Sequence, residues 1–157
     1  MIFVEQYWMG HDRDYASDLT PEVAGNAHVL IERVNVVLAR AAADDVLPAV
    51  DICTGNAVAS GWRPKAVNDA VENANKTSKH IIGCAIDVRD HVPGRPLARW
   101  CLRNREALEG AGLWMEDPQW TPSWVHLQSV PPGSGDRIFV PSTGPALAAK
   151  LPEQQAS

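Results

Sequence analysis

The stretch from Thr20 to Ala43 constrains the fold most, because it predicts one long amphipathic helix. Thr20 can cap this helix, and Pro21 suits the first helical position. Apolar residues then recur at steps of three and four and form a single stripe: Val23, Ala27, Leu30, Val34, Leu38 and Ala41. The pattern therefore indicates a helix with one apolar face.

The remaining elements are shorter and are separated by turns rich in proline and glycine. We expect two further helices, over residues 64–71 and 97–108, and a turn over residues 60–64. Five short apolar runs are typical of strands: residues 49–53, 84–88, 113–115, 124–128 and 137–140. Helices come first and strands later, with short connections, and this order indicates an α+β fold.

Composition narrows the class of protein without selecting a function. The 157 residues predict one domain over 1–157, with a polar C-terminal tail from roughly residue 145. The chain is 45% hydrophobic and 21% charged, which excludes an intrinsically disordered protein. With a net charge of −5 and no basic block, it carries no electrostatic signature of a nucleic-acid or anionic-membrane partner. We expect a monomer.

Three cysteines cannot all pair within one chain, so we expect reduced thiols at Cys53, Cys84 and Cys101. The first residues lack the basic and long apolar regions of a signal peptide, and no apolar run reaches the length of a membrane span. We therefore expect synthesis in the cytoplasm without a signal peptide.

Three side chains on or near the predicted strands suggest a metal site. His80 precedes the strand that contains Asp87, and His126 lies in another strand. A single histidine in a strand is more often a hydrogen-bonded core residue than a ligand. A carboxylate between Ile86 and Val88, however, is costly unless it is paired or bound to a metal. Three protein ligands would leave a fourth zinc position open, as in catalytic zinc sites.

The run Ser78-x-His80-x-x-Gly83-x-Ala85-x-Asp87 resembles the signature of the zinc D-Ala-D-Ala carboxypeptidase and phage endolysin family, the M15-type peptidases. Two further elements resemble those of the same family: Ser60-Gly61-Trp62-Arg63 upstream, and Trp124-Val125-His126-Leu127 in the last long strand. The three elements stand in the family's order and cover about residues 51–128.

The resemblance implies one Zn²⁺ ion held by His80, Asp87 and His126. It also implies that Arg63 binds a substrate carboxylate or polarises the scissile carbonyl, and that Ser78 forms hydrogen bonds near the zinc-binding loop. The implied fold is a small antiparallel sheet with helices packed on one side and the zinc site at the sheet face, as in Hedgehog and D-Ala-D-Ala peptidase domains.

The chain departs from the family at the general base. Many members place a carboxylate three residues before the last histidine, and this chain has Ser123 there. The nearest carboxylates are Glu116 and Asp117. Glu116 follows a strand-like run and could lie beside His126 across an antiparallel pair, so it is the first candidate base. Asp117 precedes Pro118 in an ordinary turn context and is the second candidate.

The resemblance implies a zinc metallopeptidase that hydrolyses peptide bonds in the stem or cross-link of bacterial peptidoglycan. Either the D-Ala-D-Ala or the L-Ala-D-Glu bond fits these residues. Such an enzyme would act on the cell wall after release from the cytoplasm, or as part of a phage particle. Two alternatives remain: a cytoplasmic D,D-dipeptidase, and a zinc-containing binding or structural module that has lost hydrolysis.

Overall fold

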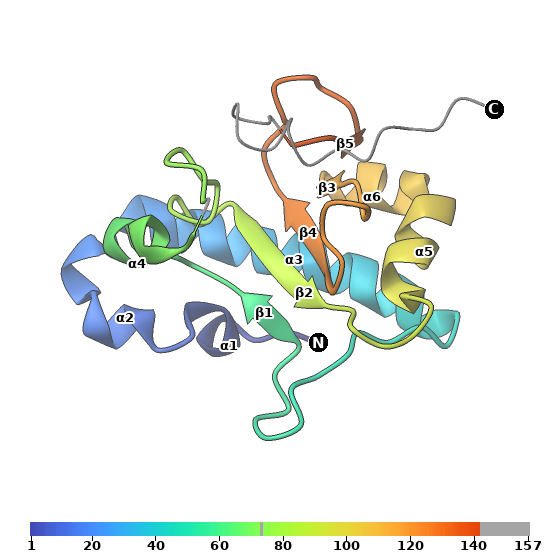
Figure 1. The fold of residues 1–157 in the computed structure, drawn as a ribbon, viewed down its shortest axis with the longest axis horizontal. Helices are drawn as coiled ribbons and strands as arrows, with labels where there is room; N and C mark the ends of the chain where they lie inside the picture. The colour runs from blue at the N-terminus through green and yellow to red at the C-terminus, as the bar shows by residue number, and fades with distance from the viewer. Residues whose placement is uncertain (73, 142–157) are drawn as a thin grey trace.

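The computed structural model describes residues 1–72 and 74–141, and its longest element is the predicted helix, α3 (Pro21–Ala43). The side chain of Thr20 accepts a hydrogen bond from the backbone N–H of Val23 at 3.2 Å, and Pro21 occupies the first turn, so the predicted start is confirmed. The face buried by α3 includes Leu30, Val34 and Val37, and the helix runs behind the sheet in Figure 1.

Within the described residues, five strands form one sheet in the order β1-β2-β4-β3-β5. Their bounds are β1 (Val58–Ser60), β2 (Ala85–Arg89), β3 (Trp114–Glu116), β4 (Trp124–Gln128) and β5 (Ile138–Phe139). Neighbours are antiparallel except β3 and β5, which are parallel. The α+β class is thus confirmed, but the sheet is mixed and not purely antiparallel.

Alternation along the central strands divides the sheet into an apolar face and a polar face. Ile86 and Val88 of β2 join Val125 and Leu127 of β4 in the hydrophobic core that contains the buried face of α3. The residues between them point the other way. This polar face of β2 and β4 therefore carries Asp87 and His126, which are paired in register.

The N-terminal residues pack against both α3 and the sheet. They form α1 (Val4–Trp8), α2 (His11–Asp14) and a 3-10 turn, Ala16–Asp18. The Asn35 side chain fixes the start of the chain, because it accepts from Ile2 N and donates to Ile2 O, both at 2.8 Å. Tyr7 is fully buried, and its hydroxyl donates to the carbonyl of Ala85 at 3.0 Å.

The predicted strand over residues 49–53 is wrong. The Asp51 carboxylate accepts hydrogen bonds from the backbone N–H groups of Cys53 and Thr54, which closes a turn there. The strand of this region, β1, lies further along the chain and includes Ser60, which was predicted as part of a turn.

The helix predicted over residues 97–108 is two helices, α5 (Pro96–Arg103) and α6 (Arg105–Ala111). Asn104 breaks it with φ −118° and ψ 51°, and both its backbone N–H and its side-chain amide donate to the carbonyl of Trp100 at 2.9 Å. The short helix predicted after Pro64 is present as α4 (Lys65–Ala70).

The remaining expectations concern the tail, the cysteines and the membrane. The predicted polar tail lies outside the described residues. All three cysteines are free: Cys84 and Cys101 are buried, and Cys53 is exposed. Within residues 1–72 and 74–141, no helix combines the length and the apolar character that crossing a bilayer requires.

Candidate metal centre

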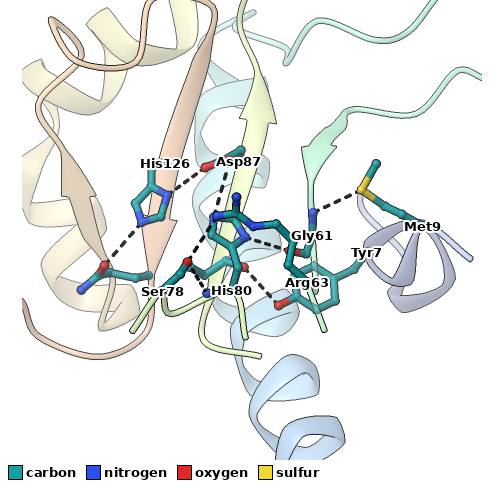
Figure 2. A network of polar contacts seen from close by, with 10 residues as sticks. Tyr7, Met9, Gly61, Arg63, Ser78, His80, Asp87 and His126 are labelled. Atoms are coloured by element: carbon teal, nitrogen blue, oxygen red, sulfur yellow. Dashed lines mark hydrogen bonds and ion pairs between the residues drawn. The ribbon is translucent and has the colours of Figure 1, made fainter. Parts of the chain in front are cut away.

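The sheet brings together the three side chains that were proposed as metal ligands. Asp87 lies on β2 opposite His126 on β4, and His80 comes from the loop that leads into β2. Gly83 turns this loop against α3: its φ is +76°, and a Cβ atom there would lie 2.6 Å from the carbonyl oxygen of Val23. Figure 2 shows both imidazoles directed at the Asp87 carboxylate.

The distances within this group fit one metal ion. Asp87 Oδ1 lies 2.8 Å from His126 Nδ1, and Asp87 Oδ2 lies 3.5 Å from His80 Nε2. One donor atom from each residue falls within 4.8 Å of the other two. Donors bound to a tetrahedral zinc ion are roughly 3.3 Å apart. The group can therefore hold a metal ion, and the predicted meeting of these three side chains is confirmed.

The electrostatics of the two histidines differ. Burial lowers the pKa of His80, although the charge of Asp87 opposes this. Burial also disfavours the charged form of His126, but the hydrogen bond and the charge of Asp87 outweigh it, so the pKa of His126 is raised. The pKa of Asp87 is lowered: burial opposes the carboxylate, and the charge of His80 and the hydrogen bond from His126 prevail.

His80 is held by the backbone of the element Ser60-Gly61-Trp62-Arg63. Its Nδ1 lies 2.7 Å from the Gly61 carbonyl oxygen, so Nδ1 carries the proton it donates there and Nε2 is free to face Asp87. Gly61 itself is pressed against α1, since a Cβ atom there would lie 1.8 Å from the carbonyl oxygen of Tyr7. Its N–H lies 3.3 Å from the Met9 sulfur (Figure 2).

Arg63 reaches the same site from the end of this element. Its backbone N–H donates to the carbonyl of His80 at 3.2 Å, and its guanidinium donates to Ser78 Oγ at 3.2 Å. Ser78 Oγ also accepts from the backbone N–H of His80 at 3.3 Å. Arg63 Nε has no hydrogen-bond acceptor among the described residues. The position of Ser78 fits the expected hydrogen bonding near the ligand loop, and its role in binding substrate stays a prediction.

The two candidate bases occupy different surroundings. Met115 pairs with Leu127, so Glu116 comes next to His126 on the polar face of the sheet. Burial raises the pKa of Glu116, an effect that the His126 charge opposes and the Asp87 charge reinforces. Asp117 instead accepts a hydrogen bond from the backbone N–H of Gln119 in a turn. Ser123 is exposed, and its carbonyl accepts from Asp90 N.

A cavity of ≈ 1290 Å³ opens on the metal group. Its wall contains the residues proposed for chemistry and a set of polar and aromatic neighbours: Arg63, Ser78, His80, Asp87, Glu116, Trp120, Trp124, His126 and Gln128. Asp117 and Ser123 are not part of the wall. The cavity therefore favours Glu116 over Asp117 as a group that can meet a ligand.

Three contributors to the site were not found from the sequence. Tyr7 and Met9 support the backbone that holds His80, from more than fifty residues away, and no local pattern marks such contacts. Gln128 lies two residues after His126 and 3.4 Å from its Nε2. Strand alternation alone places Gln128 on the His126 face, so this signal was available in the sequence.

Comparison of the chain with protein-family models, with curated proteins and with solved structures found no match.

Proposed function

We propose that this protein is a zinc-dependent peptidase that hydrolyses peptide bonds in the stem or cross-link of bacterial peptidoglycan. The observation that carries the proposal is the opening of the His80, Asp87 and His126 group onto a large cavity that Glu116 and Arg63 also line. A metal site with three protein ligands and access to a cavity has the form of a catalytic site. The proposed fold is the Hedgehog and D-Ala-D-Ala peptidase type.

A bound zinc ion supplies Lewis acidity that activates water and polarises a carbonyl. The chain supplies the proton transfers. Glu116 is the proposed general base: it takes a proton from the attacking water and returns it to the leaving amine. Its raised pKa suits both steps, because a carboxylate that is too weak a base cannot remove the proton.

Arg63 is the proposed group for a substrate carboxylate. A guanidinium presents a planar fork of donors that matches a carboxylate, and Arg63 uses one of its nitrogens on Ser78. Ser78 accepts from both Arg63 and the backbone of His80, so it links the substrate-binding side chain to the ligand loop. Arg63 therefore orients the peptide while Glu116 moves the proton.

Hydrolysis of purified cell walls, followed as loss of turbidity, tests the substrate. We expect activity with zinc, none after chelation, and recovery on zinc addition. Activity on free D-Ala-D-Ala without any on walls would favour the dipeptidase. A protein that binds zinc but hydrolyses neither substrate would favour the non-catalytic module. A protein that binds no stoichiometric divalent metal would overturn the proposal.

The pair Glu116→Gln and Asp117→Asn tests the base. Loss of a general base costs about 10²–10⁴-fold in rate, so we expect this fall for Glu116→Gln, with zinc content unchanged. Asp117→Asn is the matched control and should stay close to wild type. A large loss confined to Asp117→Asn would reverse the assignment.

A further inference from the structure

We infer that Gln128 is a positioning residue for the metal centre: its amide oxygen holds the proton of His126 on Nε2, so that Nδ1 is the nitrogen presented to the metal. The inference rests on the metal site proposed above. Neither the ligand motif nor the resemblance assigned a role to Gln128. The ligand set alone also leaves open which nitrogen of His126 binds the metal.

The strand places Gln128 where it can act on the ring. Successive side chains of β4 alternate between faces, so Gln128 shares the polar face with His126. Gln128 is 4% exposed and lines the same cavity. Its Oε1 lies 3.4 Å from His126 Nε2, while the other ring nitrogen, Nδ1, faces Asp87 at 2.8 Å.

A second hydrogen bond fixes which end of the amide faces the ring. Gln128 Nε2 donates to the carbonyl of Val130 at 2.7 Å. If the amide were reversed, its oxygen would meet the Val130 carbonyl and that bond would be lost. The group facing His126 is therefore an oxygen, which can accept a hydrogen bond from the facing ring nitrogen, Nε2, but has no proton to donate.

The neutral imidazole of His126 has two forms, with the proton on Nδ1 or on Nε2. A neutral imidazole has one bare nitrogen, and this is the nitrogen that binds a metal. In the metal-free protein His126 Nδ1 faces the site and hydrogen-bonds to Asp87. A metal ion bound there would take the place of the Nδ1 proton, and Gln128 would accept a hydrogen bond from the proton that stays on Nε2. His80 has the opposite arrangement, since its Nδ1 donates to Gly61 and its Nε2 faces the site. Each ring is oriented by an acceptor on its far side.

Ring-nitrogen NMR of the wild-type protein loaded with zinc tests the inference without any variant. We expect a protonated Nε2 and a zinc-bound Nδ1 on His126, and the reverse on His80. A zinc-bound Nε2 on His126 would overturn the inference and leave the zinc site standing. If the wild type binds no zinc, the proposed function fails. The inference then fails together with it.

Three variants separate the acceptor role of Gln128 from its tether to Val130. Gln128→Met keeps the side-chain length and removes both hydrogen bonds; Gln128→Glu keeps the acceptor and removes the donor. Gln119→Met alters an exposed glutamine and is the control. Loss of a group that orients a ligand costs ten- to hundredfold in metal affinity, so we expect that loss for Gln128→Met.

Competition with a chelator measures the zinc affinity of each variant. If the acceptor is what orients His126, the zinc affinity of Gln128→Glu should be within about threefold of wild type, and that of Gln119→Met should be unchanged. Unfolding curves of the zinc-free proteins check that each variant folds. Wild-type affinity in Gln128→Met would overturn the inference. Equal losses in Gln128→Met and Gln128→Glu would overturn it too, because the tether to Val130 would then account for the effect.

Discussion

The two histidines of the metal centre are held in different ways. His80 is 1% exposed and is anchored by a backbone carbonyl in the element that α1 presses against. His126 lies on the polar face of β4, with side chains on both of its nitrogens, Asp87 and Gln128. Both rings line the cavity, but the His80 side chain is only 2% exposed and the His126 side chain is 12% exposed. We call the His80 side of the site the packed half and the His126 side the open half. Changes to the first should affect folding, and changes to the second should affect chemistry.

The largest effect should come from replacing each histidine with alanine. Both variants should lose zinc, but His80→Ala should also lower the free energy of unfolding of the zinc-free protein by about 2–4 kcal/mol, because it empties a buried site and leaves the Gly61 carbonyl unpaired. His126→Ala should cost at least about 1 kcal/mol less, because its ring borders an open cavity. Urea unfolding in the presence of a chelator measures both losses of stability. An equal loss in the two variants, or a larger loss in His126→Ala, would contradict the difference between the two histidines.

Gly61→Ala should have the next largest effect, a loss of about 1–3 kcal/mol of stability, because the added methyl group overlaps the Tyr7 backbone. Zinc affinity should fall as well, since the carbonyl that orients His80 must move. Gly110→Ala is the control: it lies in α6 with open space around it, and alanine there should stabilise the helix by about 0.5–1 kcal/mol. Unchanged zinc binding in a folded Gly61→Ala protein would show that the His80 anchor tolerates displacement.

Tyr7→Phe should have a smaller effect, about 1–2 kcal/mol of stability, because it leaves the buried carbonyl of Ala85 without its hydroxyl donor. Thermal unfolding at several zinc concentrations measures it. Ala85 begins the strand that carries Asp87, so we expect some loss of zinc affinity too. A change in zinc affinity with no change in stability would contradict the assignment of this contact to the packed half.

The smallest effect is the pH dependence of stability, which should have opposite signs for His126 and His80. The pKa of His126 is raised, so its contribution to stability is present below its ordinary value of about 6.5 and is lost as pH rises through the folded pKa. The pKa of His80 is lowered, so its contribution is present above about 6.5 and is lost as pH falls through the folded pKa.

NMR titration of the zinc-free protein should therefore show His126 gaining its proton above pH 6.5 and His80 below it. Asp87→Asn should bring the midpoint of His126 down, because it removes the negative charge that raises the pKa of this ring. Identical midpoints for the two rings in the wild type would show that burial and Asp87 do not distinguish them.

The sequence predicted the parts of the fold that local patterns determine. The cap and stripe of α3 follow from adjacent residues, and short apolar runs located the strands that carry Asp87 and His126. The prediction was wrong where contacts between residues distant in the sequence determine the structure. Residues 49–53 are apolar enough for a strand, yet the Asp51 side chain closes a turn, and β1 forms where the chain meets β2 with a register shift between Val58 and Ser60.

The same division holds for the candidate site. The meeting of His80, Asp87 and His126 was predicted, because the motifs that contain them resemble a zinc-ligand signature and a carboxylate in an apolar strand needs a partner. The support of His80 by Tyr7 and Met9 was not, since it depends on how α1 packs against Gly61. Glu116 was named as a candidate base, and its place on the β3 strand puts it on the cavity wall.

The crowding of Gly61 against Tyr7 also bears on how such a site can diversify. Every residue has a backbone carbonyl group, so the acceptor that orients His80 is kept in any substitution at position 61 that the backbone tolerates. The close contact with Tyr7 allows few such substitutions. The acceptor that orients His126 is a side chain, so one codon can change it. Position 128, rather than position 61, is therefore where metal preference and reactivity could be tuned by mutation while the scaffold is kept.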